Sequence, residues 1–146
     1  MKNTPSRGIF FVLMKKIEHI GIAVKDLKLA NEVFEKIFGK SHYKVEKVES
    51  EGVSTSFFQV GETKIELLEA VTKDSAIAKY IENRAEGIHH LAVEVDDIHA
   101  EMKRLKSEGF QFTRDEVFKG ADNKLVCFIH PRTANGVLIE LCQEIK

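Results

Sequence analysis

Two histidines and two glutamates in this sequence have the residue types that hold a divalent metal ion. His19 and His90 lie 71 positions apart, and Glu66 and Glu140 lie 74 positions apart. Each glutamate stands between two apolar residues of a strand-like run, where a carboxylate is costly to bury unless it is paired or bound to a cation. Two imidazole nitrogens and two carboxylate oxygens suit a first-row divalent ion and leave positions for water or substrate oxygens. We therefore predict a metal site formed by His19, Glu66, His90 and Glu140.

These four residues occupy matching places in an internal duplication. Residues 17–39, IEHIGIAVKDLKLANEVFEKIFG, align with residues 88–110, IHHLAVEVDDIHAEMKRLKSEGF, at an offset of 71 positions and almost without a gap. Residues 64–69, KIELLE, correspond in the same way to residues 138–143, LIELCQ. A repeat of this length indicates two related structural modules. A single strand histidine is more often structural than a ligand, so the matched pairs are what favours a metal site.

The elements that must position these residues also repeat. In each copy the first eight or so residues alternate and are rich in Ile, Val and Leu, which predicts a strand. Asp26 and Asp97 then suit helix N-caps, and Gly39 and Gly109 suit the residues that end the helices. Three strand-like runs follow each helix: about 42–50, 53–60 and 63–70 in the first half, and about 111–118, 124–130 and 136–143 in the second.

This order of elements predicts an α+β fold made of two β-α-β-β-β modules. The modules span about residues 16–70 and 87–143 of a single domain, 16–143, and the connector 71–86 contains a short helix that begins near Asp74 or Ser75. Two such modules side by side form a curved mixed sheet around a metal-containing cleft. Residues 1–15 are interpreted as an N-terminal arm or start-site extension, because Met14 stands directly before the patterned part of the chain.

Strand alternation predicts which of the two adjacent histidines points into the cleft. The repeat aligns His90 with His19 and aligns His89 with Glu18, a residue that has no special role in the pattern. The bulky apolar residues on the opposite face suit a core packed under a helix, so His19 and His90 are expected to face the cleft and His89 to face outward. Structural or surface roles are expected for the remaining histidines, His42, His99 and His130.

The composition excludes several other classes of function. The 22 basic and 23 acidic residues give a formal charge of -1, so there is no electrostatic case for binding nucleic acid. The apolar run GIFFVLM near the N-terminus is too short to span a membrane. Cys127 and Cys142 are too few for a disulfide framework and are expected to be buried thiols. We expect a cytoplasmic protein that has neither a nucleic-acid nor a membrane partner.

At these residues the sequence resembles the vicinal oxygen chelate superfamily and, within it, the methylmalonyl-CoA epimerase family. The resemblance runs from about Lys16 to Gln143. The His and Glu positions are evidence only for the superfamily, because glyoxalase I enzymes carry a similar set. The connector DSAIAKYIE, the loop in KGADNKLVCFIHPR and the ending GVLIELCQ narrow the resemblance to the epimerases. HIGIAV, TKIELLEA and GIHHLAVEVDDI carry the four predicted ligands.

The resemblance implies an isomerase that interconverts the (R) and (S) C2 epimers of methylmalonyl-CoA through a metal-stabilised enolate. It implies one divalent ion (Co, Zn, Ni, Mn or Mg), an acyl-CoA substrate, a homodimer and Glu140 as one acid/base. In some relatives the second base is a glutamate on the strand that here reads GVSTSFF. Thr55 stands at that position and is not a base at neutral pH, so the second acid/base stays open, with Glu66 as one candidate by symmetry.

Other functions of the same fold remain as alternatives. A glyoxalase I would use similar ligands on the hemithioacetal of a thiol and a 2-oxoaldehyde. A metal-free resistance protein would sequester a small molecule, but such proteins typically lack the full ligand set. An extradiol dioxygenase commonly uses two histidines and one carboxylate on a longer chain.

Overall fold

The computed structural model describes residues 14–146. Most of the predicted N-terminal arm therefore lies outside the described residues. The first strand begins at Met14, two residues before the predicted start of the first module. Within residues 14–146, no helix is long and apolar enough to cross a membrane.

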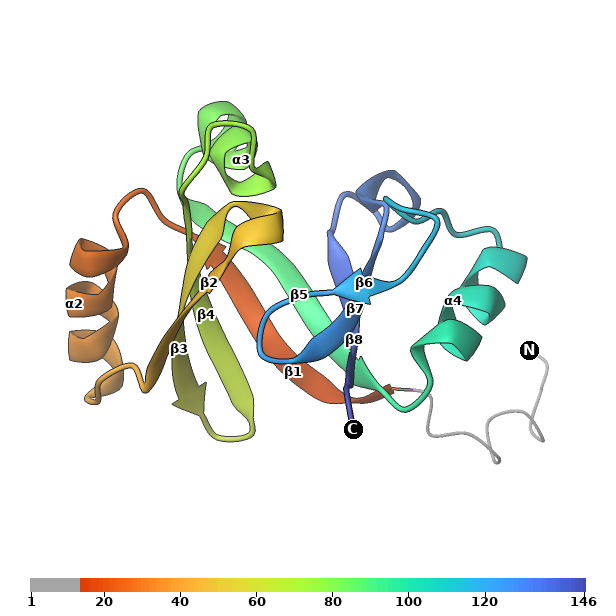
Figure 1. Cartoon of the computed structure of the whole chain (residues 1–146), viewed down its shortest axis with the longest axis horizontal. Coiled ribbons are helices and arrows are strands. Elements are labelled where there is room, and N and C mark those ends of the chain that lie inside the picture. Colours follow the sequence, from red (N-terminus) through yellow and green to blue (C-terminus); the bar gives the residue numbers. More distant parts are fainter. Residues whose placement is uncertain (1–13) are drawn as a thin grey trace.

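Eight strands form one curled mixed sheet (Figure 1), in the order β2-β3-β4-β1-β5-β8-β7-β6. The first module contributes β1 (Met14–Ala23), β2 (Lys44–Val48), β3 (Val53–Val60) and β4 (Thr63–Ala70). The second contributes β5 (Gly87–Val95), β6 (Phe118–Lys119), β7 (Lys124–Ile129) and β8 (Ile139–Glu144). The first strand of each module pairs with the other in antiparallel fashion, and this β1–β5 pair is the seam between the modules. The predicted α+β fold with a curved mixed sheet is confirmed.

Two helices cover the outer strands, one on each flank of the molecule (Figure 1). Phe34 and Phe38 of α2 (Leu27–Phe38) pack against Phe58 and Leu67 of the first module. Helix α4 (Ile98–Ser107) packs in the same way on the second module, with Met102, Leu105, Cys127 and Leu141 in one buried cluster. Each flank of the sheet therefore has its own core, and the opposite face stays open for the cleft.

The predicted caps position these helices. The carboxylate of Asp26 accepts a hydrogen bond from the Leu29 N–H at 3.0 Å, and that of Asp97 accepts one from the Ala100 N–H at 3.1 Å. Gly39 ends α2 with a φ of 72°, a left-handed conformation that favours glycine. The helix α3 (Ala76–Arg84) of the connector begins after Ser75, which caps it, as the sequence predicts.

One predicted strand is largely missing. Of residues 111–118, only Phe118 belongs to a strand, the two-residue β6, and Phe112 makes a single isolated bridge to Ile129. Residues 114–116 bend away from the sheet, and Arg114 forms an ion pair with Glu51 in η1 (Glu49–Glu51) of the first module. Backbone hydrogen bonds from Thr113 N–H to Phe128 O and from His130 N–H to Gln111 O hold residues 111–113 beside the end of β7, so the predicted strand is wrong for residues 114–117.

Two of the three register shifts in the seam are β-bulges at equivalent places in the repeat. In the register between β1 and β5, β1 has one extra residue, Glu18, opposite the step from Val93 to Ala92. In β5 the extra residue is His89. A bulge interrupts the strict alternation of side chains, so two consecutive residues can turn toward the same face of the sheet.

Both cysteines are buried free thiols on the neighbouring strands β7 and β8. Burial raises the pKa of Cys127 to about 12, and burial also raises the pKa of Cys142. The expectation of buried thiols is confirmed.

Candidate metal centre in the cleft

A cavity of about 250 Å³ lies in the concave face of the sheet, between the two modules. Its wall includes side chains from β1, β3, β4, β5, β7 and β8 and from the loop before β7. All four predicted ligands line this cavity: His19, Glu66, His90 and Glu140. All four are at least nine-tenths buried. The duplication therefore brings residues from distant parts of the chain to one buried place.

Three of the four predicted ligands converge on one point. The Nε2 atoms of His19 and His90 lie 3.0 Å apart, and Oε1 of Glu140 lies 3.4 Å from the first and 3.2 Å from the second. One ligand atom from each residue lies within 4.8 Å of the other two. Two imidazole nitrogens and one carboxylate oxygen facing one another in a buried cleft are a suitable donor set for a divalent cation.

Glu66 lies beside this group but on the other side of the His19 ring. Its Oε2 is 3.2 Å from Nδ1 of His19, not from Nε2. Glu18, His19 and Glu66 form a second group whose possible ligand atoms lie within 4.8 Å of one another. The structure thus brings Glu66 to the predicted site through its contact with His19.

The electrostatics of the site favour a positive charge between the carboxylates. Burial alone would lower the pKa of His19, but the carboxylates of Glu66 and Glu140 raise it well above its ordinary value. Burial alone would raise the pKa of Glu140, but His19 and His90 outweigh it and hold that pKa well below its ordinary range. Burial lowers the pKa of His90. A neutral imidazole is the form that can bind a metal, and a divalent cation would supply the positive charge that these carboxylates stabilise.

The pKa of Glu66 is shifted in the opposite direction from that of Glu140. Burial raises the pKa of Glu66 to about 7, and the charges of Glu140 and Glu18 add to this effect against that of His19. The pKa values of two carboxyl groups in one cleft are therefore shifted in opposite directions, a pattern typical of sites for acid and base catalysis.

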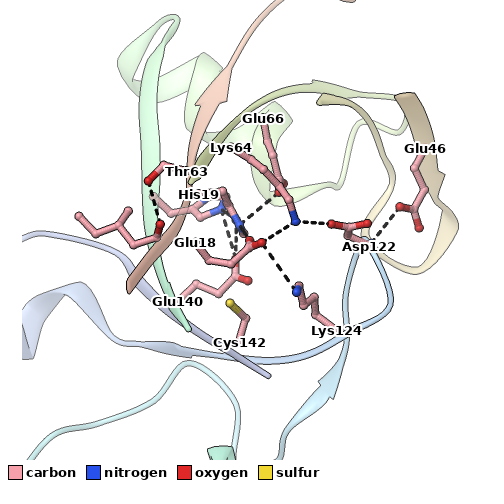
Figure 2. Close-up of polar contacts among 12 residues, drawn as sticks. Glu18, His19, Glu46, Thr63, Lys64, Glu66, Asp122, Lys124, Glu140 and Cys142 are labelled. Carbon is pink, nitrogen blue, oxygen red and sulfur yellow. Dashed lines mark hydrogen bonds and ion pairs between the residues drawn. The ribbon is translucent and has the colours of Figure 1, made fainter. Parts of the chain in front are cut away.

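Sequence reasoning missed Glu18, which is part of this site. Its Oε1 lies 2.6 Å from Nδ1 of His19, and its Oε2 accepts a hydrogen bond from Lys64 at 2.5 Å. Figure 2 shows Lys64 between Glu18 and Asp122, with His19 and Glu140 close by. A carboxylate on the far nitrogen of a ligand histidine fixes its tautomer and ring orientation. The only sequence signal was a charged residue in an apolar strand, at the place that the repeat matches to His89.

The predicted outward orientation of His89 was wrong. His89 lines the cavity, and its Nδ1 lies 2.9 Å from Nδ1 of His90. Its ring also packs edge to face against Tyr80, with the centroids 4.9 Å apart. The bulge at His89 explains the error, because strict alternation does not hold there. Glu18 and His89, which the repeat aligns, therefore each contact Nδ1 of the histidine that follows.

A glycine makes room for His90. Gly21 is the seam partner of His90, and a Cβ atom at Gly21 would lie 2.2 Å from Cε1 of the His90 ring. The repeat matches Gly21 to Ala92, which is the partner of His19. The two modules therefore differ in the space they leave beside their histidines.

Ion pairs across the cleft join the modules at three residues of the second module: Asp122, Arg114 and Lys124, whose Nζ lies 3.7 Å from Oε2 of Glu18. Asp122, in the loop before β7, accepts hydrogen bonds from Lys44 at 2.6 Å and from Lys64 at 2.7 Å. Arg114 pairs with Glu51 at 3.0 Å, as described above. The ion pairs of Asp122 and Arg114 join the segment between α4 and β7 to the first module. Asp122, Arg114 and Glu51 line the cavity.

Of the other residues considered in the sequence, His42, His99 and His130 lie outside the cavity, whereas Thr55 is part of its wall. His42 contacts the carboxylate of Glu35 at 2.8 Å, and His130 accepts a hydrogen bond from the Arg132 N–H next to η2 (Pro131–Thr133). His99 is on the exposed side of α4. Thr55 lines the cavity from β3.

Comparisons with known proteins agree with this architecture. The model of the Glyoxalase/Bleomycin resistance protein/Dioxygenase superfamily matches residues 18–128. The human mitochondrial methylmalonyl-CoA epimerase is 39% identical over 129 residues, which are 88% of this chain and 73% of that protein. An ethylmalonyl-CoA/methylmalonyl-CoA epimerase of Cereibacter sphaeroides is 38% identical over 133 residues, which are 90% of this chain and 99% of that protein.

Solved structures are similar along nearly the whole chain. The methylmalonyl-CoA epimerase of Mycobacterium tuberculosis superposes with a TM-score of 0.88 at 32% identity, covering 97% of both chains. A Streptomyces coelicolor methylmalonyl-CoA epimerase variant in complex with 2-nitronate-propionyl-CoA has a TM-score of 0.86 at 30% identity, covering 90% of this chain and 95% of that one. The family model covers most of the sequence and these relatives are similar over nearly their full length, so the chain belongs to the glyoxalase/bleomycin resistance protein/dioxygenase superfamily.

Proposed function

We propose that this protein is a metal-dependent epimerase that interconverts the C2 epimers of methylmalonyl-CoA. The observation that carries the proposal is the buried convergence of His19, His90 and Glu140 in a cleft of about 250 Å³. Relatives and structural neighbours of similar length that bear the name methylmalonyl-CoA epimerase support the choice of substrate.

His19, His90 and Glu140 would hold one divalent ion, with Glu66 next to His19 as the fourth candidate ligand. Co, Zn, Ni, Mn and Mg remain candidates, because availability as well as affinity decides which ion a site binds. When bound, a divalent ion would supply Lewis-acid chemistry, that is, stabilisation of the negative charge that develops on the substrate as its C2 proton is removed. Glu18 keeps the Nδ1 proton of His19 in place, which leaves Nε2 free as the ligand atom.

The two glutamates would move the C2 proton. Glu140 is ionised, because His19 and His90 hold its pKa low, and can accept the proton from one face of C2. Glu66 has a pKa of about 7 and can donate a proton to the opposite face. Their contacts with opposite nitrogens of His19 support this division of roles. Proton removal on one face and return on the other inverts the configuration, and the reverse reaction exchanges the two roles.

The outer face of the seam supports a homodimer. Ile17 of β1 and Ile88 of β5 are 45% and 65% exposed, respectively, and face away from the cleft. Helices α2 and α4 lie over the flanking strands and leave this central strip uncovered (Figure 1). We infer that a second copy of the chain covers it.

Deuterium exchange at C2 of methylmalonyl-CoA in heavy water tests the function. We expect exchange to require a divalent ion and to fall about 100-fold or more in Glu140→Gln and Glu66→Gln, since general acid or base catalysis contributes about 10²–10⁴-fold. The matched assay follows turnover of the glutathione–methylglyoxal adduct. Absence of exchange in the metal-loaded protein contradicts the proposal, and turnover of the adduct would instead indicate a glyoxalase I. Protein purified without chelator and free of bound metal would favour a sequestering function.

A further inference from the structure

The hydroxyl of Thr55 has no hydrogen-bond partner, although the side chain is completely buried. Thr55 lies in β3 and is 0% exposed, and its Oγ1 makes no hydrogen bond within residues 14–146. A buried polar group normally finds a partner, and an unsatisfied one destabilises the folded state. Thr55 also lines the cleft, so the missing partner can be a group that enters the cleft.

The position of Thr55 in the sheet places it next to Glu66. In the β3–β4 register Thr55 pairs with Leu68, and the next pair on the same face is Phe57 with Glu66. Thr55 and Glu66 are therefore diagonal neighbours, and such residues lie about 7 Å apart. No hydrogen bond joins the two side chains.

Among the neighbours of Thr55 on this face of the sheet, those on β3 and β4 are apolar except Glu66, and the direct partner of Thr55 on β2 is Glu46. Val53 precedes it on the same face of β3, and Leu68 lies opposite it on β4. Thr55 thus supplies an uncharged donor at the border between the charged centre and an apolar end of the cleft.

We propose that Thr55 binds the substrate by donating a hydrogen bond from Oγ1 to its carboxylate. This inference rests on the proposed function, in which the substrate is an acyl-CoA with a carboxylate at C2. A hydroxyl that donates to a carboxylate makes a stronger, charge-assisted hydrogen bond. Thr55 therefore positions the C2 carbon against Glu66 and favours acyl-CoA thioesters that carry a carboxylate.

Ser56 offers a matched control on the same strand. Its Oγ is also buried and without a partner, but strand alternation places it on the opposite face of β3, and it does not line the cleft. Removing either hydroxyl relieves an unsatisfied buried group. Only Thr55 belongs to the cleft wall, where its hydroxyl can donate a hydrogen bond to the substrate.

The test compares Thr55→Val, Thr55→Ser and Ser56→Ala in the metal-loaded protein. Calorimetric titration with malonyl-CoA and with acetyl-CoA isolates the carboxylate, because the two ligands differ only in that group. We expect Thr55→Val to weaken malonyl-CoA binding about tenfold, the size of a hydrogen bond to a charged group, and to leave acetyl-CoA binding unchanged. The Tm of this variant should equal or exceed that of the parent protein.

Thr55→Ser keeps the hydroxyl and should keep the preference for malonyl-CoA, and Ser56→Ala should change neither affinity. Unchanged malonyl-CoA binding in Thr55→Val would overturn the inference, as would an equal loss of both ligands. Thr55→Ala serves as a second variant if valine lowers the Tm. A parent protein that binds malonyl-CoA but shows no C2 exchange on methylmalonyl-CoA would contradict the proposed function alone, because the Thr55 contact would still be measurable.

Discussion

Gly21 determines where the His90 ring can lie. Its Cα hydrogen occupies the place where a Cβ would lie 2.2 Å from the ring. We predict that Gly21→Ala displaces the His90 imidazole and lowers metal affinity by roughly 10–100-fold, the usual effect of disturbing the groups that orient a ligand. Competition titration with a chromogenic chelator measures the affinity.

Ala92 provides the control for this change. It holds the equivalent place in the second module and faces His19. Ala92→Gly removes a methyl group without creating a contact, so we expect metal affinity to stay within about twofold, while stability falls by about 1 kcal/mol because of the added backbone freedom. Equal losses of affinity in both variants would show that the His90 ring does not depend on the space at Gly21.

At the scale of residues, the sequence was informative where the repeat supplied a second copy. His19, Glu66, His90 and Glu140 were found because each has a counterpart in the other module. Glu18 was not found, because its role depends on a bulge, and a bulge is a property of the register between two strands that are distant in the sequence. The unsatisfied hydroxyl of Thr55 also appears only when its surroundings are known.

At the scale of elements, the loop before β7 is fastened to the first module by Asp122. Burial tends to raise the pKa of this carboxyl, but hydrogen bonds from Lys44 and Lys64 lower it below its ordinary value of about 3.9. A lowered pKa in the folded state adds stability above the ordinary pKa, and this stability is lost as the pH falls through the lowered value.

We predict that Asp122→Asn lowers the free energy of unfolding by about 1 kcal/mol at pH 7, because the ion pairs are only partly buried. The difference from the parent protein should shrink below about pH 4 and vanish at lower pH, as the parent carboxyl becomes protonated. Urea unfolding of both proteins from pH 7 to below about pH 4 measures this difference in the free energy of unfolding. Asp115, exposed in the same segment, gives the control Asp115→Asn, for which we expect the free energy of unfolding at pH 7 to stay within about 0.5 kcal/mol of the parent value. A constant difference at every pH would rule out the ion pairs as its cause.

The helices could be predicted from the sequence, whereas one of the strands could not. Asp26, Asp97 and Ser75 cap helices through contacts only three residues long, so local sequence contains the necessary information. The segment 111–118 alternates like a strand, but Arg114 finds Glu51, a partner 63 residues away. The local sequence pattern contains no information about a contact with such a distant residue.

At the scale of the whole molecule, the exposed strip on the seam should control assembly. We predict that Ile88→Lys converts a dimer into a monomer, since a charge in the middle of an apolar interface must be desolvated without a partner. Sedimentation velocity measures the mass of the particle. Leu29, 58% exposed on α2 and away from the seam, gives the matched control Leu29→Lys, which should remain dimeric. A parent protein that sediments as a monomer, or dissociation in both variants, would refute this placement of the interface.

The duplication allowed the architecture to be predicted, because two copies of one module suggest two similar halves around a shared cleft. It did not predict the antiparallel pairing of β1 with β5 or the contacts at Asp122 and Arg114. These join different modules, and a comparison of the modules with each other contains no information about how they meet.

The two buried thiols have a practical consequence for spectroscopy. Cys127 and Cys142 are the only cysteines of the sequence, and burial keeps both protonated and unreactive at neutral pH. A cysteine introduced on the surface of each module would therefore take up a maleimide dye or a nitroxide selectively, with no need to remove the native thiols. Distance measurements between two such labels would report directly whether the modules move apart when an acyl-CoA enters the cleft.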